Sequence, residues 1–391
     1  MFNFLFGNHL LIWRAEMRWF RTFSVVVLAL CVFEVLSEFV FAQDYIRLGA
    51  YLPMTGGVAA YGEMEWKGIE IAKSMEPEVL GKKLDVIRED TKSDQIEASN
   101  AVSLLVEMKV AGLIGEAISA DTMAGNPISE KAQIPSVSPT ATNPLVTQGK
   151  KYAFRACFTD PFQGEVAAKF ALNNLKSKTA AIIIDHSQDY SVGLGAFFEK
   201  EFDKLGGKIV SKTFIQTGDQ DFSAQLSSIQ AGNPDLIYAP IYYTEDALMA
   251  KQARDLGIMT PIMTGDGAQA DQLIEIGGKA VEGMYLTGHF HKDAVNTERA
   301  KEFAALYKAK YKEDVSAFVA LGADAYILLV DAMKRAGSIE GPKVRDALAD
   351  TKDFKGVSGS MTMGPDGNPL KGMVINKVEN GKFVYVTTVT P

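Results

Sequence analysis

Polar and aromatic side chains stand directly after several predicted β-strands of this chain. They are Ser119, Thr140, Thr142, Tyr190, Tyr242 and Asp266. Hydroxyl and backbone N–H groups suit a carboxylate, and the carboxylate of Asp266, set between two glycines, suits an ammonium group. Tyrosines add apolar walls with a polar tip. These residue types together predict a site for a small zwitterion. Taken singly, each residue could instead end a turn or cap a helix.

Residue patterns of known catalytic sites are missing from the sequence. It has no G-x-S-x-G elbow, Walker A loop, H-E-x-x-H or C-x-x-C. His289 and His291 would share one face of a strand, but no evident third metal ligand accompanies them. We therefore expect a binding protein that uses no metal and no cofactor. The alternative, an amide or peptide hydrolase, would need a nucleophile beside a base, and no such pair is visible.

Short apolar runs that alternate with amphipathic helices must position the polar residues. Predicted strands span Tyr45–Leu52, 84–88, 110–114, 179–184, 209–214, 236–240 and 283–287. One helical stripe consists of Ala98, Ala101, Val102 and Leu105, and a second of Leu194, Phe197, Phe198, Phe202 and Leu205. This alternation predicts an α/β fold with a doubly wound parallel sheet. In such sheets ligands bind beyond the carboxyl ends of the strands, which is where the polar residues stand.

The pattern indicates two lobes of similar topology. Residues 84–119 and 209–243 both run strand, acidic turn, helix, strand and polar residues. The segment 158–164 interrupts the alternation, and we interpret it as a crossover between the lobes. The interruption disfavours the alternative of one large sheet. At the C-terminus an Asn-Gly pair joins the β runs 373–378 and 383–389, which predicts a hairpin.

The N-terminus has the order of features of a secretory signal. Arginines precede an apolar run over 23–33, and small residues end at Ala42. We predict that residues 1–42 are a signal peptide that is cleaved on export. A permanent membrane anchor is the alternative, but the run is too short to cross a bilayer. The leader is long, so translation could begin at Met17 instead of Met1.

Composition narrows the class of protein further. The net charge is −8 and no basic cluster occurs, which argues against a nucleic-acid partner. After residue 42 the only cysteine is Cys157, so the exported chain cannot form an intramolecular disulfide. A length of 391 residues favours two lobes over one continuous core.

Several segments resemble one known family. They are 51–62 (YLPMTGGVAAYG), 134–144 (IPSVSPTATNP), 188–194 (QDYSVGL), 219–223 (DQDFS), 252–257 (QARDLG) and 282–284 (EGM). In this order and spacing they resemble the periplasmic leucine/isoleucine/valine-binding proteins, the type I solute-binding proteins of branched-chain amino-acid ABC transporters. The resemblance extends over essentially all of residues 44–391.

The resemblance implies two Rossmann-like lobes joined by a multi-strand hinge. One lobe would comprise 43–160 with 290–362, and the other 161–289 with 363–391. It also implies a monomeric periplasmic protein that binds an amino acid and delivers it to an inner-membrane ABC permease. A ligand-sensing receptor or regulator of the same fold is the alternative function.

The resemblance further implies how the ligand head group is held. Ser119 and Thr142 would grip the α-carboxylate. The backbone carbonyl of Thr140 would accept a hydrogen bond from the α-ammonium group, which would pair with Asp266.

The remaining implied contacts surround the ligand. Tyr190 would close over it from the second lobe, and Tyr61 and Tyr242 would wall the side-chain pocket. Ala141, between the two threonines, belongs to the same implied ligand-binding set.

The chain departs from the family pattern in three respects. The acid that meets the ammonium group is often glutamate, whereas Asp266 is one methylene shorter. Ser93 and Ile118 stand where several members have a small disulfide. Glu116 is expected to place a carboxylate near the cleft, where a neutral or weakly basic residue is common. These departures leave the side chain of the ligand open.

Overall fold

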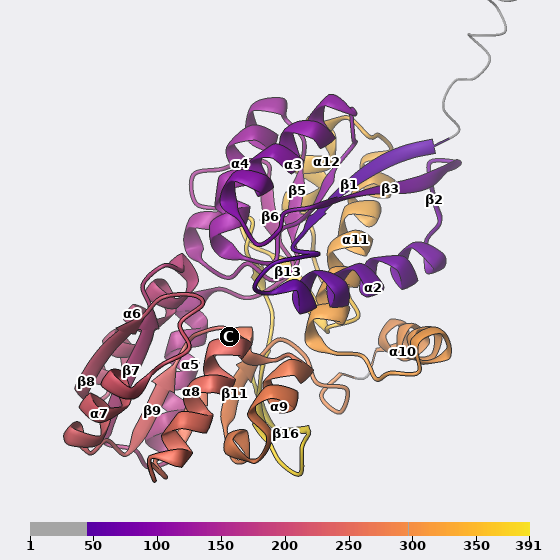
Figure 1. Cartoon of the computed structure of the whole chain (residues 1–391). Helices are drawn as coiled ribbons and strands as arrows, with labels where there is room; N and C mark the ends of the chain where they lie inside the picture. Colours follow the sequence, from indigo (N-terminus) through magenta and orange to yellow (C-terminus); the bar gives the residue numbers. More distant parts are fainter. Residues whose placement is uncertain (1–44, 296) are drawn as a thin grey trace, which may run out of the picture. The chain divides into compact units, whose positions relative to one another are not determined.

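Two β-sheets organise the chain in the computed structural model, which describes residues 45–295 and 297–391. The signal peptide predicted for 1–42 lies outside the described residues. Each sheet is the centre of an α/β lobe, and both lobes belong to the compact unit from Ile46 to Pro391 (Figure 1).

The first sheet has six strands in the order β2-β3-β1-β4-β5-β6. Their bounds are β1 Tyr45–Leu52, β2 Glu78–Val79, β3 Lys82–Asp90, β4 Leu113–Gly115, β5 Ser136–Ser138 and β6 Ala153–Arg155. β1, β4, β5 and β6 pair in parallel. Their carboxyl ends therefore meet at one edge of the sheet, which is where the polar residues after β4 and β5 stand.

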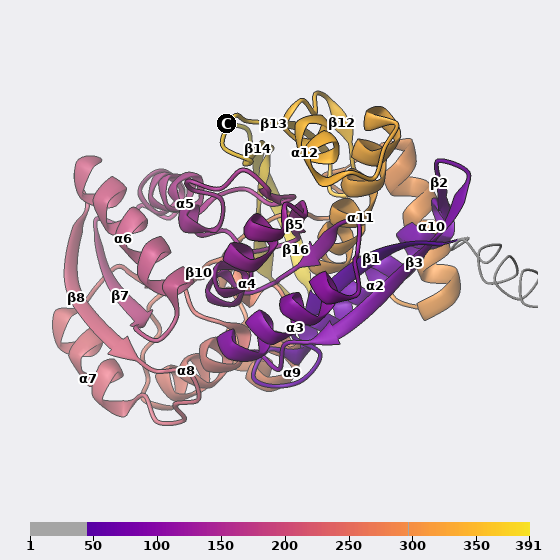
Figure 2. The same ribbon diagram turned by 90° about the horizontal axis from the view of Figure 1, so that it is seen from above.

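Strand β1 shows why helices cover both faces of this sheet. Ile46, Leu48 and Ala50 join the main core, which includes residues of α2 (Ala59–Met75) and α11 (Ala317–Ala336). Tyr51 packs instead in a cluster with Val102, which lies on α3 (Gln95–Glu107). Successive side chains of a strand point to opposite faces, so one apolar strand serves two helical layers. Helix α4 (Ser119–Ala132) packs beside α3, and α2 packs beside α11 (Figure 2).

The second sheet has seven strands in the order β16-β15-β11-β10-β9-β7-β8. Their bounds are β7 Thr179–Asp185, β8 Lys208–Ile215, β9 Leu236–Ala239, β10 Ile262–Thr264, β11 Tyr285–Gly288, β15 Met373–Val378 and β16 Phe383–Val389. The strands from β7 to β11 are parallel, whereas β15 and β16 run antiparallel at one edge. The helices of this part are α5 Asp160–Asn173, α6 Asp189–Lys204, α7 Ser223–Gly232, α8 Tyr243–Asp255 and α9 Asp271–Gly277.

The chain passes between the two sheets three times. It crosses after β6, again after β11, and finally before β15. Between the second and third crossings lie α10 (Glu298–Tyr311), α11 and α12 (Gly341–Ala349), followed by a small sheet of β12 (Phe354–Lys355), β13 (Ser360–Met363) and β14 (Pro369–Leu370). The residue boundaries given above for the two lobes stay a prediction.

The strands expected from apolar runs are all present, within a few residues of their expected ends. The C-terminal hairpin is also present, as β15 and β16. In α3 the buried residues are Ala98, Ala101, Val102 and Leu105, the stripe read from the sequence. The second stripe was wrong at one end. Leu205 lies just beyond the last residue of α6 and is exposed, because the helix ends before it can turn this side chain inward.

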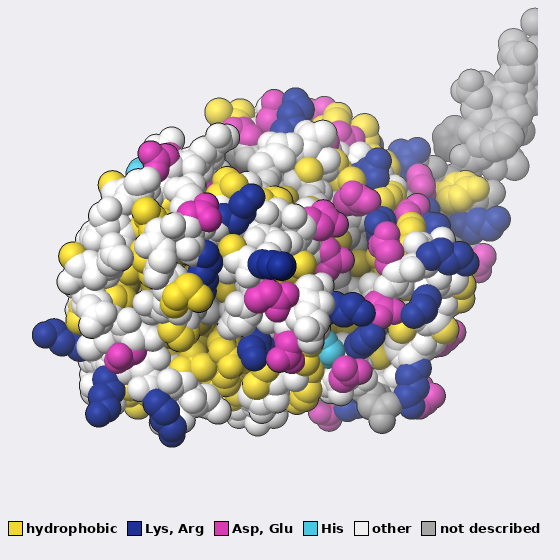
Figure 3. All heavy atoms as spheres, turned by 60° about the horizontal axis from the view of Figure 1, so that its bottom comes forward, with side chains coloured by type: hydrophobic (Ala, Val, Ile, Leu, Met, Phe, Trp, Pro, Cys, Tyr) yellow, Lys and Arg dark blue, Asp and Glu magenta, His cyan; other side chains and the backbone are white. Residues whose placement is uncertain are grey.

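Charges of both signs are mixed over the surface in Figure 3, where Lys and Arg lie among Asp and Glu. This agrees with a net charge that is spread along the chain. None of the described helices has the length and apolarity needed to cross a membrane.

Candidate ligand-binding site

A narrow pocket lies where loops that follow strands of the two sheets meet. Its lining consists of Tyr61, Ala117, Ser119, Thr140, Thr142, Tyr190, Tyr242, Asp266, Gly267 and Phe318. Seven of the eight residues predicted as a ligand-binding set are in this lining. The eighth, Ala141, is not. The structure thus brings together residues that the sequence separates by more than 200 positions, as the pair Tyr61 and Gly267 illustrates.

One side of the pocket is built from the loops that follow β4 and β5. Ser119 is the first residue of α4, and its hydroxyl accepts a hydrogen bond from the backbone N–H of Asn143 at 3.2 Å. Thr140 donates from its hydroxyl to Glu65 Oε1 at 2.7 Å and to the carbonyl of Ala117 at 3.1 Å. The N-terminus of α4 carries unpaired N–H groups and a partial positive charge. This side of the pocket therefore favours an anionic group.

A buried arginine holds the loop after β5 in place from the interior of the protein. Arg155, at the end of β6, is fully buried and donates to the carbonyls of Ala141 at 2.6 Å and Asn143 at 2.8 Å. The carbonyl of Ala141 is thus used inside the protein, which explains why Ala141 does not line the pocket. Sequence reasoning missed this arginine. The signal that could have revealed it is a charged residue inside an otherwise apolar run of strand length.

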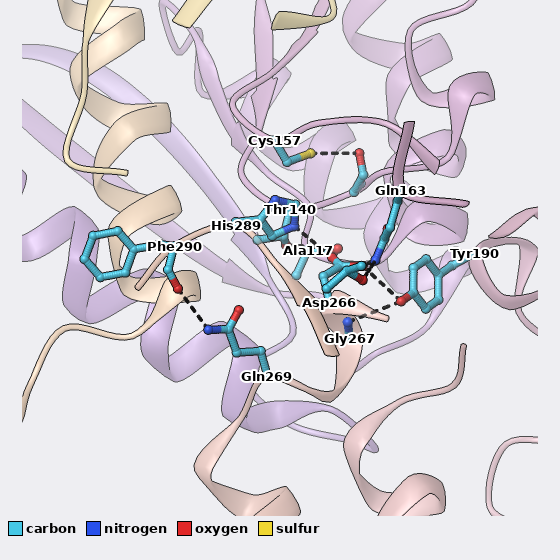
Figure 4. A network of polar contacts seen from close by, with 12 residues as sticks. Ala117, Thr140, Cys157, Gln163, Tyr190, Asp266, Gly267, Gln269, His289 and Phe290 are labelled. Atoms are coloured by element: carbon cyan, nitrogen blue, oxygen red, sulfur yellow. Dashed lines mark hydrogen bonds and ion pairs between the residues drawn. The ribbon is translucent and has the colours of Figure 1, made fainter. Parts of the chain in front are cut away.

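The other side of the pocket is dominated by Asp266, which begins the short 3₁₀ helix η2 (Asp266–Ala268) after β10. Its Oδ1 accepts hydrogen bonds from Gln163 Nε2 at 2.7 Å and from the Tyr190 hydroxyl at 3.0 Å. Its Oδ2 lies 2.8 Å from Nε2 of His289 (Figure 4). Asp266 is only 3% exposed. Of these partners only Tyr190 was expected at the site, and neither Gln163 nor His289 was predicted there.

The electrostatics of this side depend on the charge of His289. Burial lowers the pKa of its imidazole, although the neighbouring Asp266 opposes that shift. A neutral imidazole donates one hydrogen bond to Asp266 and leaves the negative charge of the carboxylate in place. Since Gln163 and Tyr190 are also neutral donors, this side of the pocket keeps a net negative charge.

Aromatic rings form the remaining wall. Tyr61 stacks on Phe318 with ring centroids 4.2 Å apart, and its edge meets Tyr242 at 5.7 Å. Tyr242 in turn lies parallel to Tyr190 at 5.4 Å. Gly267 lets these rings approach, because a Cβ at that position would lie 2.9 Å from a ring carbon of Tyr242. The wall is therefore largely apolar and tightly packed.

Direct hydrogen bonds join the two sides of the pocket. The Tyr61 hydroxyl donates to the carbonyl of Gly267, and Asn143 Nδ2 donates to the carbonyl of Asp189 at 2.9 Å. A third bond, at 3.4 Å, runs from the Tyr243 hydroxyl to the carbonyl of Gly57. The structure is thus a closed arrangement in which both lobes contribute to one pocket.

Glu116, whose carboxylate was expected near the cleft, is held inside the protein. It is fully buried, and its carboxylate accepts hydrogen bonds from the Thr91 hydroxyl at 2.7 Å and from the backbone N–H of Ile118. It is absent from the pocket lining. Its neighbour Ala117 does line the pocket, so Glu116 lies behind the lining, where Thr91 and the backbone of its own loop satisfy its carboxylate oxygens.

The two histidines considered as a metal pair have separate partners. His289 bonds to Asp266, whereas His291 Nε2 lies 3.2 Å from the carbonyl of Phe383. Among the described residues, no cluster of three or more His, Cys, Asp or Glu side chains could hold a metal ion.

The family model of the periplasmic binding proteins matches residues 45–382. The chain belongs to this family. A leucine-specific-binding protein of Salmonella typhimurium is 31% identical over 351 residues, which is 88% of this chain and 91% of that protein.

Two solved structures share the fold and much of the sequence. The crystal structure of a leucine-binding protein from Thermotoga maritima is 45% identical with a TM-score of 0.87, covering 88% of this chain and 99% of that one. The isoleucine complex of a branched-chain amino acid transporter substrate-binding protein from Streptococcus pneumoniae is 32% identical with a TM-score of 0.84. That match covers 89% of this chain and 100% of the other. The expected fold of two α/β lobes and the resemblance to the branched-chain amino-acid binding proteins are thus confirmed.

Proposed function

We propose that this protein captures an α-amino acid, branched-chain or related, in the pocket between its lobes and delivers it to an ABC transporter. One observation carries the proposal: a single pocket has an anion-favouring side and a buried carboxylate, Asp266, that only neutral donors hold. A zwitterion satisfies both sides at once. The related proteins are named for leucine binding or were solved in complex with isoleucine, which supports this class of ligand.

The ligand would lie with its carboxylate near Ser119 and Thr142. The N-terminus of α4 and the buried charge of Arg155 both favour an anion there. Its ammonium group would pair with Asp266, and the carbonyl of Thr140 would accept a further hydrogen bond from it. The apolar side chain would contact Tyr61 and the other rings of the wall.

Closure of the lobes would couple binding to transport. Because the first lobe supplies Ser119 and the second supplies Asp266, a ligand contacts both only in the closed state. It therefore shifts the population toward that state. A permease that recognises the closed form would receive only loaded protein. We further propose that the chain is exported by residues 1–42, acts in the periplasm as a monomer, and docks on an inner-membrane permease.

The alternatives are weaker on specific grounds. Two of the relatives named above are leucine-binding proteins and the third is the substrate-binding protein of a transporter, and none of them is named a regulator. For a hydrolase, Ser119 would need a base at its side, and neither histidine nor cysteine occurs among the described residues that line the pocket. A regulator would bind the same ligand without a permease partner, so the presence of permease genes beside this gene is the discriminating observation.

A thermal-shift screen tests the proposal. The protein should first be unfolded and refolded to remove any carried-over ligand, and then melted with each amino acid and with small carboxylates. A ligand present at 100 times its dissociation constant stabilises the protein by about 2.7 kcal/mol. We expect the largest shifts with leucine, isoleucine and valine. If no amino acid raises the melting temperature, the amino-acid proposal is rejected.

A further inference from the structure

The hydrogen bond between His289 and Asp266 connects the pocket to the three crossings between the sheets, which are the segments that the implied hinge would consist of. His289 directly follows β11 and lies in the second crossing between the sheets. Its ring stacks on Phe158, at a centroid distance of 3.8 Å and an interplanar angle of 29°. Phe158 lies in the first crossing, between β6 and α5. Both residues are 2% exposed, so this contact is part of the packed interior.

The third crossing reaches the same point. Lys371 is 3% exposed and donates to the carbonyl of Ala156 at 3.0 Å and to the Ser358 hydroxyl at 2.6 Å. Ala156 and Phe158 belong to the same short segment of the first crossing. The second and third crossings therefore contact the first crossing at Phe158 and Ala156, which are two residues apart. The hydrogen bond from His289 joins Asp266 to this cluster.

The surroundings of His289 fit a neutral imidazole that donates a hydrogen bond to the carboxylate of Asp266. Its Nδ1 has no hydrogen-bond partner among the described residues, and its Nε2 faces Oδ2 of Asp266. The neutral tautomer with the proton on Nε2 satisfies this arrangement. An imidazolium would place a second N–H in a position without an acceptor, and would cancel the charge of Asp266.

We propose that His289 is a positioning residue that makes the pocket select ligands carrying an ammonium group. It holds Asp266 as an uncompensated anion beside the crossings, so that closing the lobes over a ligand without a cation buries an unpaired charge. The inference rests on the proposed function and adds to it the residue that enforces zwitterion over plain carboxylate. A hinge-linked donor is suited to this task, since the donor keeps its place only when the three crossings are packed together.

The test compares L-leucine with 4-methylpentanoate, which is leucine without its ammonium group. Calorimetry on refolded protein at pH 7.5 gives both dissociation constants, with competition against leucine for the weaker ligand. The readout is the selectivity, the ratio of the constant for 4-methylpentanoate to that for leucine. His289→Leu keeps an apolar side chain against Phe158 but removes the donor. We expect it to weaken leucine binding about 10-fold or more, while 4-methylpentanoate loses less, so that selectivity falls.

Two further variants complete the design. His289→Gln restores a neutral donor and should recover most of the lost selectivity. His291→Leu is the matched control, because His291 bonds to Phe383 rather than to Asp266, and it should keep wild-type selectivity. If His289→Leu weakens both ligands by the same factor, or neither, His289 has only a structural role and the proposal is overturned. Wild-type protein that binds no amino acid would instead reject the proposed function itself.

A pH series keeps the test decisive if His289→Leu fails to fold. The charged groups that act on His289 are Asp266, which favours the imidazolium, and Lys371 of the third crossing, which opposes it. In the wild type, selectivity should fall as acid converts His289 to imidazolium and cancels the charge of Asp266. Glutamine does not titrate, so the selectivity of His289→Gln should change less than that of the wild type over the same pH range. Identical pH profiles in the two proteins would contradict the proposal.

Discussion

A buried glutamate behind the pocket should make this protein less stable as the pH rises. Glu65 lies on α2 and is fully buried, with Oε1 accepting from the Thr140 hydroxyl at 2.7 Å. Its Oε2 has no hydrogen-bond partner among the described residues. Burial raises the pKa of Glu65 from 4.5 to about 8, partly offset by the hydrogen bond from Thr140.

The sign of the effect follows from proton binding. Between pH 4.5 and 8 the folded protein keeps a proton on Glu65 that the unfolded chain releases. The stability linked to this group is therefore fully present below pH 4.5 and is lost as pH rises through about 8. Each pKa unit corresponds to about 1.4 kcal/mol, so the whole effect is on the order of 5 kcal/mol.

Glu65→Gln tests this reasoning. The amide oxygen can still accept from Thr140, but the side chain no longer titrates. We expect the variant to match the wild type near pH 4 and to exceed it at pH 9 by up to about 5 kcal/mol. Urea unfolding at several pH values, with m-values compared, gives the free energies of unfolding. Glu63→Gln is the control on the same helix, because Glu63 is exposed and pairs with Lys67.

The result that would refute the reasoning is a parallel pair of curves. If wild type and Glu65→Gln lose stability equally between pH 5 and 9, Glu65 is ionised in the folded protein. The burial argument would then fail at this position.

Three further predictions concern the closure contact, the free thiol and the buried arginine. Asn143→Ala should weaken ligand binding about 2- to 10-fold in calorimetry, because it removes a hydrogen bond between the lobes without touching the ligand. Unchanged affinity would show that this bond contributes nothing to closure. Cys157 is buried, which raises its pKa to about 12, so native exported protein should not react with a thiol reagent and one thiol should appear on unfolding. Reaction in the native state would contradict its placement. Arg155→Met should lower the free energy of unfolding by about 2–4 kcal/mol, because the carbonyls of Ala141 and Asn143 lose their donor; a change below about 0.5 kcal/mol would argue against that role.

The sequence predicted the elements whose pattern is local. Strand β1 and the buried stripe of α3 follow from runs and spacings within a dozen residues. The bounds of the short strands β5, β6 and β10 were not predicted, because three residues alone are too few to show a period. Strand β4 is equally short, but it overlaps the five-residue apolar run 110–114, which predicted it.

The residues of the candidate site also divide into those that the sequence predicted and those that it did not. Asp266 was predicted because strand ends of α/β sheets collect ligand-binding groups. Its partners Gln163 and His289 were not predicted, since they come from α5 and from the segment after β11, and only the folded chain brings them together. Phe318 was also missed. It lies on a helix buried on nearly every side, where no face of the pattern distinguishes a pocket residue from a core residue.

The role of Asp266 as partner of the ammonium group can be measured directly. The measurement is the affinity of Asp266→Asn for the amino acid that gives the largest thermal shift. This substitution keeps the shape of the side chain and removes its charge. A buried ammonium group would lose its partner, which costs about 2–5 kcal/mol of binding free energy. We expect calorimetry to show a loss of affinity between about 30-fold and several thousand-fold. Equal affinity in variant and wild type, with both proteins folded, would contradict the claim that Asp266 receives the ammonium group.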